Sequence, residues 1–382
     1  MKSAMFVSHT GEKGGAEIFL IDLLKAGPQE WQACFLSDGS ALDELVKSGR
    51  QPLLLKVGQK MLSVRRGSSP RALAAAALDV FVAAWKLSRE ARNYDVICAN
   101  SQKSLFVCAL AAKLSGRPLV WFLHDIITDA AFSASNRRAS LAFARFFAQR
   151  VGVNSLETGK AFISAGGQAD KVRTVYNGFD PDAAPVHDPQ LATALRAKLG
   201  LDDRPLVGLF GRLSEWKGQH VLLEALARTA DVQAVIVGGA LFGQQAYERE
   251  IQALATRLGL DDRVRFLGFR DDVQTLMAAM DIVVHTSITP EPFGRVVVEG
   301  MLAGRPVIAT IGGGVTEIVR DGRTGLLVPP GDVGALTAAI DKIISDPNLA
   351  AMLSTEGRKD VATRFSLKTT LNSVANILAE VG

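Results

Sequence analysis

Short apolar runs alternate with longer amphipathic segments along the whole chain. Such runs predict buried β-strands, and the segments between them are long enough to form helices. In the first half the predicted strands are Ala4–Ser8, Gln32–Leu36, Pro52–Leu55, Val96–Ala99, Leu119–Leu123 and Arg150–Asn154. In the second half they are Leu206–Phe210, Gln233–Val237, Val264–Phe266, Ile282–His285, Pro306–Ala309 and Gly325–Val328. This alternation predicts parallel sheets joined by right-handed crossovers.

A segment rich in Pro, Asp and Ala, Asp180–Pro189, separates the two series of strands. A chain of 382 residues is also too long for one ordinary core. We therefore expect an α/β protein with two doubly wound parallel-sheet domains, residues 1–183 and 184–365, followed by a C-terminal helix within 366–382. Ligands of such sheets bind beyond the carboxyl ends of the strands.

The composition favours a compact enzyme, with 48% hydrophobic and 21% charged residues. Three widely spaced cysteines predict small buried residues of a reducing compartment. The N-terminal apolar run is too short for a signal peptide, and the longest one, 72–85, is too short to span a bilayer. We expect a soluble, cytoplasmic protein.

Positive charge is concentrated in the first half of the chain. Residues 1–182 hold 23 Lys and Arg against 16 Asp and Glu, and the remainder holds 20 against 23. Basic residues interleaved with apolar ones suit an anionic membrane or an anionic, lipid-linked substrate, and a solvated loop is the alternative. Nucleic acid is disfavoured because neither an aromatic platform nor a known binding motif accompanies the charges. The basic cluster consists of Lys56, Lys60, Arg65, Arg66 and Arg71.

Two glycines, Gly14 and Gly15, follow the first predicted strand and open a helix predicted over 18–25. Glycines allow a ligand to approach the backbone closely, and a helix N-terminus favours negative charge. A simple turn is the alternative. The pattern is not the dinucleotide fingerprint, which disfavours an NAD-dependent enzyme.

The second half opens with two cations, Arg212 and Lys217, in the loop after its first strand. Two positive charges there can neutralise a diphosphate leaving group. The alternative is a salt-bridged surface turn.

Two glutamates eight positions apart, Glu291 and Glu299, follow the strand 282–285. The first lies in a loop and the second in the short helix after it, so both carboxylates can face one cleft. Carboxylates accept hydrogen bonds from sugar hydroxyls, and the helix start suits a phosphate. Two unrelated surface glutamates are the alternative.

A His-Asp pair, His124 and Asp125, follows the strand 119–123. The imidazole could bind a sugar hydroxyl or carry a proton, with the carboxylate orienting it. A structural histidine is the alternative. The other histidines are interpreted as structural: His9, His187, His220 and His285.

Together these motifs resemble the retaining glycosyltransferases of family 4, which have the two-domain GT-B fold. Glu291 and Glu299 match the E-x7-E signature, and 211–218 matches the family's GRL-x-x-x-KG segment. Residues 177–180 match its N-G-x-D turn, and 312–317 resemble its G-G-x-x-E segment, which makes Glu317 a further donor contact. The resemblance covers nearly the whole chain, with the motifs in family order.

The resemblance implies that residues 1–183 bind the acceptor, that 184–365 bind the nucleotide-sugar, and that the helix in 366–382 packs back across the hinge onto the N-terminal domain. It implies catalytic roles for His124, Arg212, Lys217 and Glu291. The implied acceptor contacts are Gly15 and Asp125. The implied donor contacts are Gly14, Gly15, Arg212, Lys217, Gly238, Phe269, Arg270, Glu291, Phe293, Gly294, Arg295 and Glu299.

The roles implied for the donor contacts differ. Glu299 would hold the ribose, while Glu291 and the backbone N–H groups of Phe293 and Gly294 would bind the sugar. The loops that carry Gly238, Phe269 and Arg270 would border the nucleotide base. Two features depart from the family pattern: Gly300 stands where Ala is commoner, and Arg295 occupies a position that is more often apolar.

The implied function is retaining transfer of a sugar from a UDP- or GDP-sugar to a hydroxyl, with a lipid-linked saccharide of bacterial surface polysaccharide synthesis as the expected acceptor. We expect peripheral contact with an anionic membrane. No cofactor or metal is expected, because the His, Cys and Asp residues fall in no usual ligand spacing. The alternatives are a nucleotide-sugar epimerase of the same fold and a non-catalytic nucleotide- or polysaccharide-binding protein.

Overall fold

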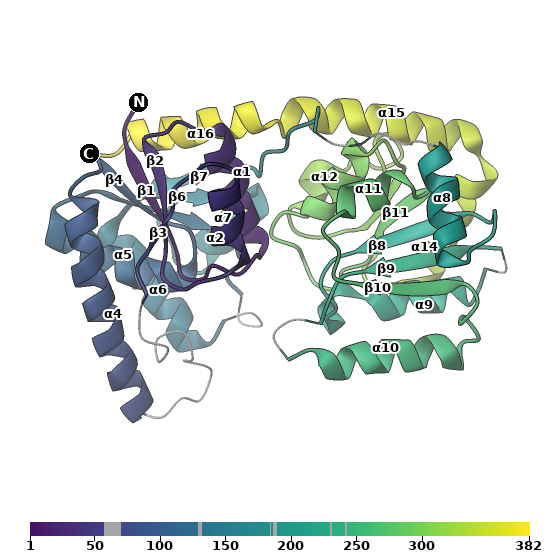
Figure 1. Ribbon diagram of the computed structural model, residues 1–382, viewed down its shortest axis with the longest axis horizontal. Coiled ribbons are helices and arrows are strands. Elements are labelled where there is room, and N and C mark those ends of the chain that lie inside the picture. The colour runs from purple at the N-terminus through teal and green to yellow at the C-terminus, as the bar shows by residue number, and fades with distance from the viewer. Residues whose placement is uncertain (57–69, 129–131, 184, 186–188, 230, 241–242) are drawn as a thin grey trace. The chain divides into compact units, whose positions relative to one another are not determined.

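A computed structural model describes residues 1–56, 70–128, 132–183, 185, 189–229, 231–240 and 243–382. The chain divides into two compact units (Figure 1). The N-terminal unit comprises Met1–Gly178 and Leu367–Gly382, and the C-terminal unit comprises Phe179–Ser366. The boundary after Gly178 precedes the one expected after residue 183 by five residues (183 − 178).

The N-terminal unit is built on a seven-stranded sheet with the order β3-β2-β1-β4-β5-β6-β7. All neighbouring strands are parallel. The order reverses between β1 and β4, because the chain fills one side of β1 first and then crosses to the other. The strands are β1 (Ala4–Ser8), β2 (Trp31–Phe35), β3 (Leu53–Leu54), β4 (Val96–Ala99), β5 (Leu119–Leu123), β6 (Ala148–Val153) and β7 (Val172–Thr174).

Helices cover both faces of this sheet, so its central strands are apolar throughout and do not alternate with polar residues. One face carries a core that includes Trp121, Leu105 and Leu87. The other carries a core of Phe6, Phe122 and neighbours. The helices of this unit are α1 (Gly15–Ala26), α2 (Ser40–Lys47), α4 (Pro70–Ala91), α5 (Gln102–Ser115), α6 (Ala134–Phe147), α7 (Leu156–Ser164) and α16 (Leu367–Ala379).

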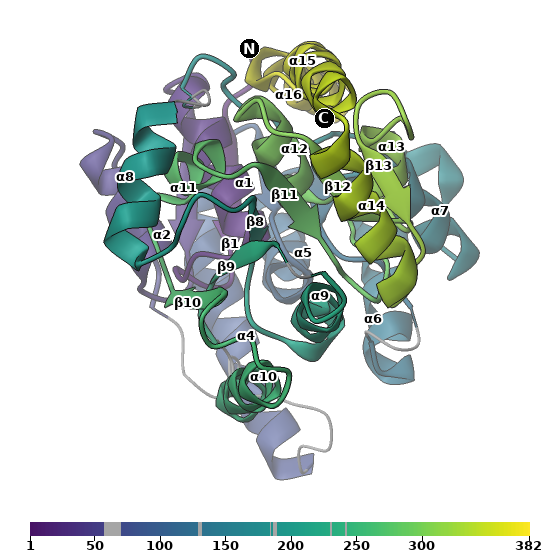
Figure 2. The same ribbon diagram turned by 90° about the vertical axis from the view of Figure 1, so that its right-hand side faces the viewer.

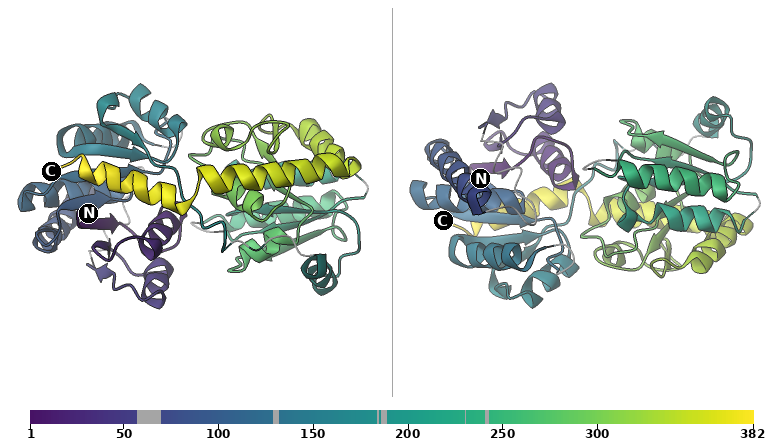
Figure 3. Two further views of the ribbon diagram at one scale, coloured as in Figure 1. Left: turned by 90° about the horizontal axis from the view of Figure 1, so that it is seen from above. Right: turned by 90° about the horizontal axis from the view of Figure 1, so that it is seen from below.

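The C-terminal helix α16 belongs to the N-terminal unit. Its residues Val374, Ile377 and Leu378 are part of the same core as Phe6 and Phe122. Figure 3 shows this helix, in yellow, lying along the unit that contains the N-terminus.

The C-terminal unit repeats the design with a six-stranded parallel sheet of order β10-β9-β8-β11-β12-β13 (Figure 2). Its strands are β8 (Leu206–Phe210), β9 (Gln233–Val237), β10 (Val264–Gly268), β11 (Ile282–His285), β12 (Val307–Thr310) and β13 (Leu326–Val328). Its helices are α8 (Pro189–Leu199), α9 (Gln219–Leu226), α10 (Gln245–Arg257), α11 (Val273–Ala278), α12 (Arg295–Leu302), α13 (Val315–Ile318), α14 (Val333–Ser345) and α15 (Pro347–Arg364).

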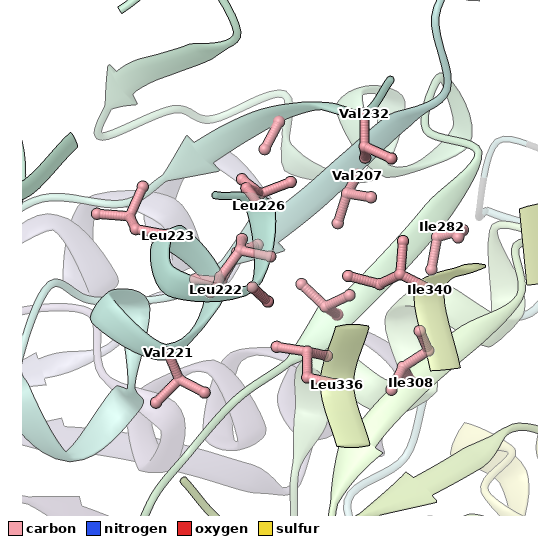
Figure 4. Packing of buried hydrophobic residues seen from close by; sticks show 14 of the residues in the cluster. Val207, Val221, Leu222, Leu223, Leu226, Val232, Ile282, Ile308, Leu336 and Ile340 are labelled. Atoms are coloured by element: carbon pink, nitrogen blue, oxygen red, sulfur yellow. The ribbon is translucent and has the colours of Figure 1, made fainter. Parts of the chain in front are cut away.

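Aliphatic side chains from strands and helices form the core of this unit. Val207 and Ile308 of the sheet lie in the same cluster as Leu222 of α9 and Ile340 of α14 (Figure 4). This rigid packing fixes the strand ends from which the functional loops extend.

The expected fold class is confirmed, because both units are doubly wound parallel α/β sheets. Sequence analysis missed β7, since its three residues Val172–Thr174 include Arg and Thr and form no apolar run. It also placed the start of β6 at Arg150, whereas the strand starts at Ala148. Among the described residues, every helix is too short or too polar to cross a bilayer.

Most of the basic cluster named above lies outside the described residues. This holds for Lys60, Arg65 and Arg66. Lys56 is exposed, and Arg71 belongs to α4 in a part whose side chains are not described.

Candidate active site

The predicted catalytic loops of the C-terminal unit follow its two central strands. The strands β8 and β11 are neighbours at the point where the strand order reverses. Lys217 lies in a 3-10 turn, Glu215–Lys217, that follows β8, and Glu291 lies in the loop between β11 and α12. Parallel strands place both loops at one edge of the sheet, where ligands of such sheets bind.

Glu291 is the centre of a buried polar cluster, and its residue is 7% exposed. Lys217 Nζ forms an ion pair with its Oε1. Ser287 Oγ donates to the same oxygen at 2.6 Å, and His285 Nε2 lies 3.2 Å from it. All three donors therefore converge on one carboxylate oxygen.

The charge state of Glu291 follows from these contacts. Burial by itself raises the pKa of this carboxyl, but the charge of Lys217 and the hydrogen bond from His285 outweigh burial and hold the pKa well below its usual range. The group is a carboxylate near neutral pH. A carboxylate that accepts three hydrogen bonds is a weak base and a weak nucleophile, but it still accepts hydrogen bonds from hydroxyls.

His285 was interpreted as structural, and the structure instead brings it to Glu291. It ends β11, and its Nδ1 lies 3.3 Å from Thr310 Oγ1 at the end of the neighbouring strand β12. Thr310 in turn donates to the carbonyl of Ser287 at 2.8 Å. The sequence did contain a signal for a site residue here, because His285 is a polar residue at the carboxyl end of a buried strand. The same signal led to the choice of His124.

The loop that carries Glu291 is held by close backbone contacts. Gly314 N–H donates to the Glu291 carbonyl at 2.9 Å. Gly313 has φ +60°, and a Cβ at that position would lie 1.9 Å from the same carbonyl oxygen. Only glycine allows this approach. Gly294, with φ +105°, is the N-cap of α12, so the loop enters that helix with the backbone N–H groups of the first turn at the sheet edge.

The second glutamate of the signature lies one helix turn from Arg295. Glu299 Oε1 is 3.2 Å from Arg295 Nη2, and both side chains are largely buried. The Arg295 guanidinium also lies 4.6 Å from the ring centre of Phe179. That ring stacks on Phe293, with centroids 6.3 Å apart. Arg295 thus orients the carboxylate of Glu299, which lies on the same helix and is expected to bind the ribose.

The loops after β8, β9 and β10 are joined through their backbones. Gly211 N–H donates to the Val237 carbonyl at 2.9 Å, and Gly238 N–H donates to the Gly268 carbonyl at 2.8 Å. Arg212, in the first of these loops, is half-buried. The loop of Arg212, which is expected to bind a phosphate, and the loops expected to border the base are therefore hydrogen-bonded to one another at one edge of the sheet.

Two residues expected near the base lie just beyond β10. Phe269 is 64% exposed, which leaves its ring open to stacking. Arg270 pairs with Asp272 at 2.6 Å and is half-buried. In the loop after β8, Lys217 also contacts an aromatic ring, because its Nζ lies 4.4 Å from the ring centre of Trp216.

The N-terminal unit carries a separate polar cluster at its sheet edge. His124 Nε2 lies 2.9 Å from Asn100 Oδ1. The amide nitrogen of Asn100 donates to the Ala16 carbonyl at 2.9 Å, which fixes the amide orientation and so places the imidazole proton on Nε2. Asp125, beside His124, is exposed.

A buried glutamate in the same unit was not assigned a role from the sequence. Glu17, in the first turn of α1, accepts a hydrogen bond from Ser8 Oγ at 2.7 Å and is 4% exposed. Burial raises the pKa of Glu17, the bond from Ser8 opposes this, and the charge of Asp125 adds to the rise. Gly15, which starts α1, has open space where a Cβ would point, as an acceptor contact requires.

His9 is a third member of the N-terminal cluster. Its Nδ1 lies 3.0 Å from Ser101 Oγ. Burial, together with the charge of Lys103, lowers the pKa of His9 to about 4, so the ring is neutral near pH 7. The structural interpretation of this histidine stays a prediction.

The predicted site residues thus divide between the two units. The N-terminal unit holds Gly14, Gly15, His124 and Asp125, and the others belong to the C-terminal unit. Within the part of the chain that the structure describes, His, Cys, Asp and Glu form no group that could hold a metal ion. The cysteines Cys34, Cys98 and Cys108 are buried, and burial raises the pKa of Cys34 to about 12.

Two family models match the chain. The model for Glycosyltransferase Family 4 matches residues 13–183, and the model for Glycosyl transferases group 1 matches residues 192–360. Together they cover both units.

Curated relatives match mainly over half of the chain. The lipopolysaccharide core biosynthesis glycosyltransferase LpsE of Rhizobium meliloti is 37% identical over 48% of this chain and 53% of the relative. A D-inositol 3-phosphate glycosyltransferase of a Mycobacterium species is 38% identical over 46% of this chain and 40% of the relative. The chain thus matches about half of the length of these relatives.

A solved structure matches from end to end. HepE of Anabaena, in complex with UDP and glucose, superposes with a TM-score of 0.90 at 38% identity, covering 99% of this chain and all of the other. The same protein has also been solved with UDP-glucose. From the two family models and this full-length match, the chain has the GT-B fold and is a member of glycosyltransferase family 4.

Proposed function

We propose that the protein transfers a sugar from a UDP-sugar to a hydroxyl of an acceptor, with retention of anomeric configuration and without a metal ion. The observation that carries the proposal is the buried, ionised Glu291 beside Lys217 at the switch point of the C-terminal sheet. UDP is preferred over GDP because HepE, which is similar over its whole length, has been solved with UDP-glucose.

The donor phosphates would bind the two cations after β8. Lys217 has three N–H donors, so it can hold Glu291 and a phosphate oxygen together. Arg212 offers a planar fork that suits a second phosphate oxygen. Positive charge at the leaving diphosphate stabilises the transition state, which makes a metal unnecessary.

Glu291 would bind hydroxyls of the transferred sugar and would not attack it. Its lowered pKa and its three hydrogen-bond donors make it a poor nucleophile. The reaction is therefore a same-face substitution. The bond from the anomeric carbon to the phosphate oxygen breaks, the acceptor oxygen bonds to that carbon, and the leaving phosphate takes the acceptor's proton.

The remaining predicted contacts would frame the donor. Glu299, oriented by Arg295, would hold the ribose, and the exposed ring of Phe269 would stack on the base. Backbone N–H groups at Phe293 and Gly294 would complete the sugar site. Gly14 would approach the diphosphate.

The acceptor would be a lipid-linked saccharide of bacterial surface polysaccharide synthesis. The excess of positive charge in residues 1–182 and the similarity to LpsE support this class. His124 and Asp125 would bind hydroxyls on the acceptor side, and the protein would work at the cytoplasmic face of an anionic membrane.

Calorimetric titration of UDP, GDP and ADP in EDTA tests the donor site. We expect micromolar UDP binding without metal, lost in Arg212→Ala, and weaker binding of the other two. Failure of all three nucleotides to bind would contradict the proposal and favour a non-catalytic role. If UDP binds, incubation with UDP-sugars tests the chemistry, because release of an isomerised sugar nucleotide without acceptor would identify an epimerase.

A further inference from the structure

We propose that the outer face of α4 in the N-terminal unit is a contact surface for an anionic lipid bilayer. Leu78, Phe81, Val82 and Trp85 are 64%, 55%, 43% and 45% exposed. Their spacing of three, four and seven residues places them on one side of the helix. We call these four residues the α4 stripe.

The stripe is an outer face and not a part of the core that failed to pack. The opposite side of the same helix carries Ala83, Ala84 and Leu87, which are at most 1% exposed and belong to the core against α5. The helix is therefore held in place with the stripe facing outward. Contiguous exposed apolar residues of this kind mark interaction surfaces, whereas single exposed ones are normal.

Positive charge continues the stripe along the helix. The Arg89 guanidinium lies 3.8 Å from the ring centre of Trp85. Lys86, Arg89 and Arg92 are all exposed. The acidic residues of this part of α4, Asp79 and Glu90, are half-buried at the flanks of the face. Along α4, the outer face is thus apolar from Leu78 to Trp85 and carries positive charge from Lys86 onward.

The side chains of this face suit a membrane surface. Leu and Phe side chains suit the acyl region, tryptophan is favoured at the interface, and Lys and Arg bind anionic headgroups.

Charge favours a membrane over a second copy of this chain. A two-fold contact would offer this face only its own set of side chains, in which the exposed cations Lys86, Arg89 and Arg92 outnumber the half-buried acids Asp79 and Glu90. An anionic bilayer instead complements these cations. The inference rests on the proposed function, because a membrane contact serves an enzyme whose acceptor is lipid-linked. Vesicle binding can nevertheless be measured in the absence of sugar transfer.

Vesicle sedimentation of the full chain tests the surface. Wild-type protein is mixed with phosphatidylcholine vesicles that contain or lack phosphatidylglycerol. The variant is the double substitution F81E/W85E, and the control is F146E, which places a single glutamate at an aromatic residue of α6 that is 76% exposed. We expect wild type and F146E to bind the anionic vesicles, with binding of F81E/W85E reduced by about tenfold or more.

Several results would overturn the inference. They are failure of the wild type to bind anionic vesicles, equal binding by F81E/W85E, or a wild-type dimer in light scattering that becomes monomeric in that variant. Thermal unfolding and UDP titration serve as controls, because a wild-type Tm and a wild-type UDP affinity show that the variant is folded. If the wild-type protein does not bind UDP, the proposed function is contradicted, but the vesicle result can still be interpreted.

Discussion

Glu291 and Glu17 are both buried carboxyl groups beyond a central strand of a parallel sheet, yet their surroundings shift their pKa values in opposite directions. Glu291 has the ammonium of Lys217 on one of its oxygens, and its pKa is lowered. Glu17 has the neutral hydroxyl of Ser8, and its pKa is raised by burial. The comparison teaches that one cation decides in which direction the pKa of a buried glutamate is shifted.

The difference fits the two ligands that we propose. The C-terminal site needs fixed charges, because it holds a diphosphate and a sugar whose reacting bond develops charge. The N-terminal cluster would bind neutral hydroxyls, for which amide, imidazole and hydroxyl groups suffice. His124, Asn100 and Ser8 are groups of this kind.

The largest effect is expected from removal of the cation. Lys217→Ala should lower turnover by a factor of about 10² or more, because one charge at the leaving diphosphate is lost. It should also lower the free energy of unfolding by about 3 kcal/mol, because Glu291 loses its buried partner. Steady-state kinetics and thermal unfolding measure the two effects. Lys342→Ala, an exposed lysine of α14, is the matched control. Wild-type turnover in Lys217→Ala would contradict the assigned role.

A smaller effect is expected at His285, for which we propose a role in positioning Glu291. His285→Leu removes a hydrogen bond to a charged group, so turnover should fall about tenfold. The KM for the donor should change less than turnover does. His285→Gln can restore a donor toward Glu291 and should recover part of the loss. Equal activity of the Leu and Gln variants would show that the ring only fills space.

The smallest effect is a contrast in the pH dependence of stability. Glu291 has a lowered pKa, so its stabilisation is present above its unfolded pKa, near 4.5, and is lost as the pH falls below it. Glu17 has a raised pKa, so its contribution is present below about 4.5 and is lost as the pH rises through the folded value.

Glutamine variants measure this contrast. Relative to wild type, Glu291→Gln should lower the Tm at pH 7, and the difference should shrink toward pH 4. Glu17→Gln should show the opposite trend, with its most favourable Tm difference at pH 7. Parallel trends in the two variants would contradict the opposite directions of the two pKa shifts.

Sequence patterns predicted the fold for a physical reason. The central strands are buried on both faces, so they are mainly apolar and stand out in the sequence. Lys217 and Glu291 lie in loops at strand ends, and the parallel topology alone brings such loops to one edge. The order of the elements therefore predicts that the two loops lie at one edge, and the ion pair between Lys217 and Glu291 is seen only in the structure.

The contacts missed from the sequence depend on side-chain direction. His285 reaches Glu291 because β11 ends with its imidazole between that carboxylate and Thr310 of β12, which no spacing in the sequence encodes. The raised pKa of Glu17 depends on the depth of its burial. The strand β7 was missed because a short strand that includes polar residues has no apolar signature.

The most direct test of the account compares the affinities of UDP-glucose and UDP for wild-type protein and Glu291→Gln. If Glu291 binds the sugar as an ionised acceptor, the variant should retain the wild-type affinity for UDP and lose about tenfold in affinity for UDP-glucose. Wild-type affinity for both ligands in the variant would contradict the account, because the buried carboxylate would then have no part in recognising the sugar.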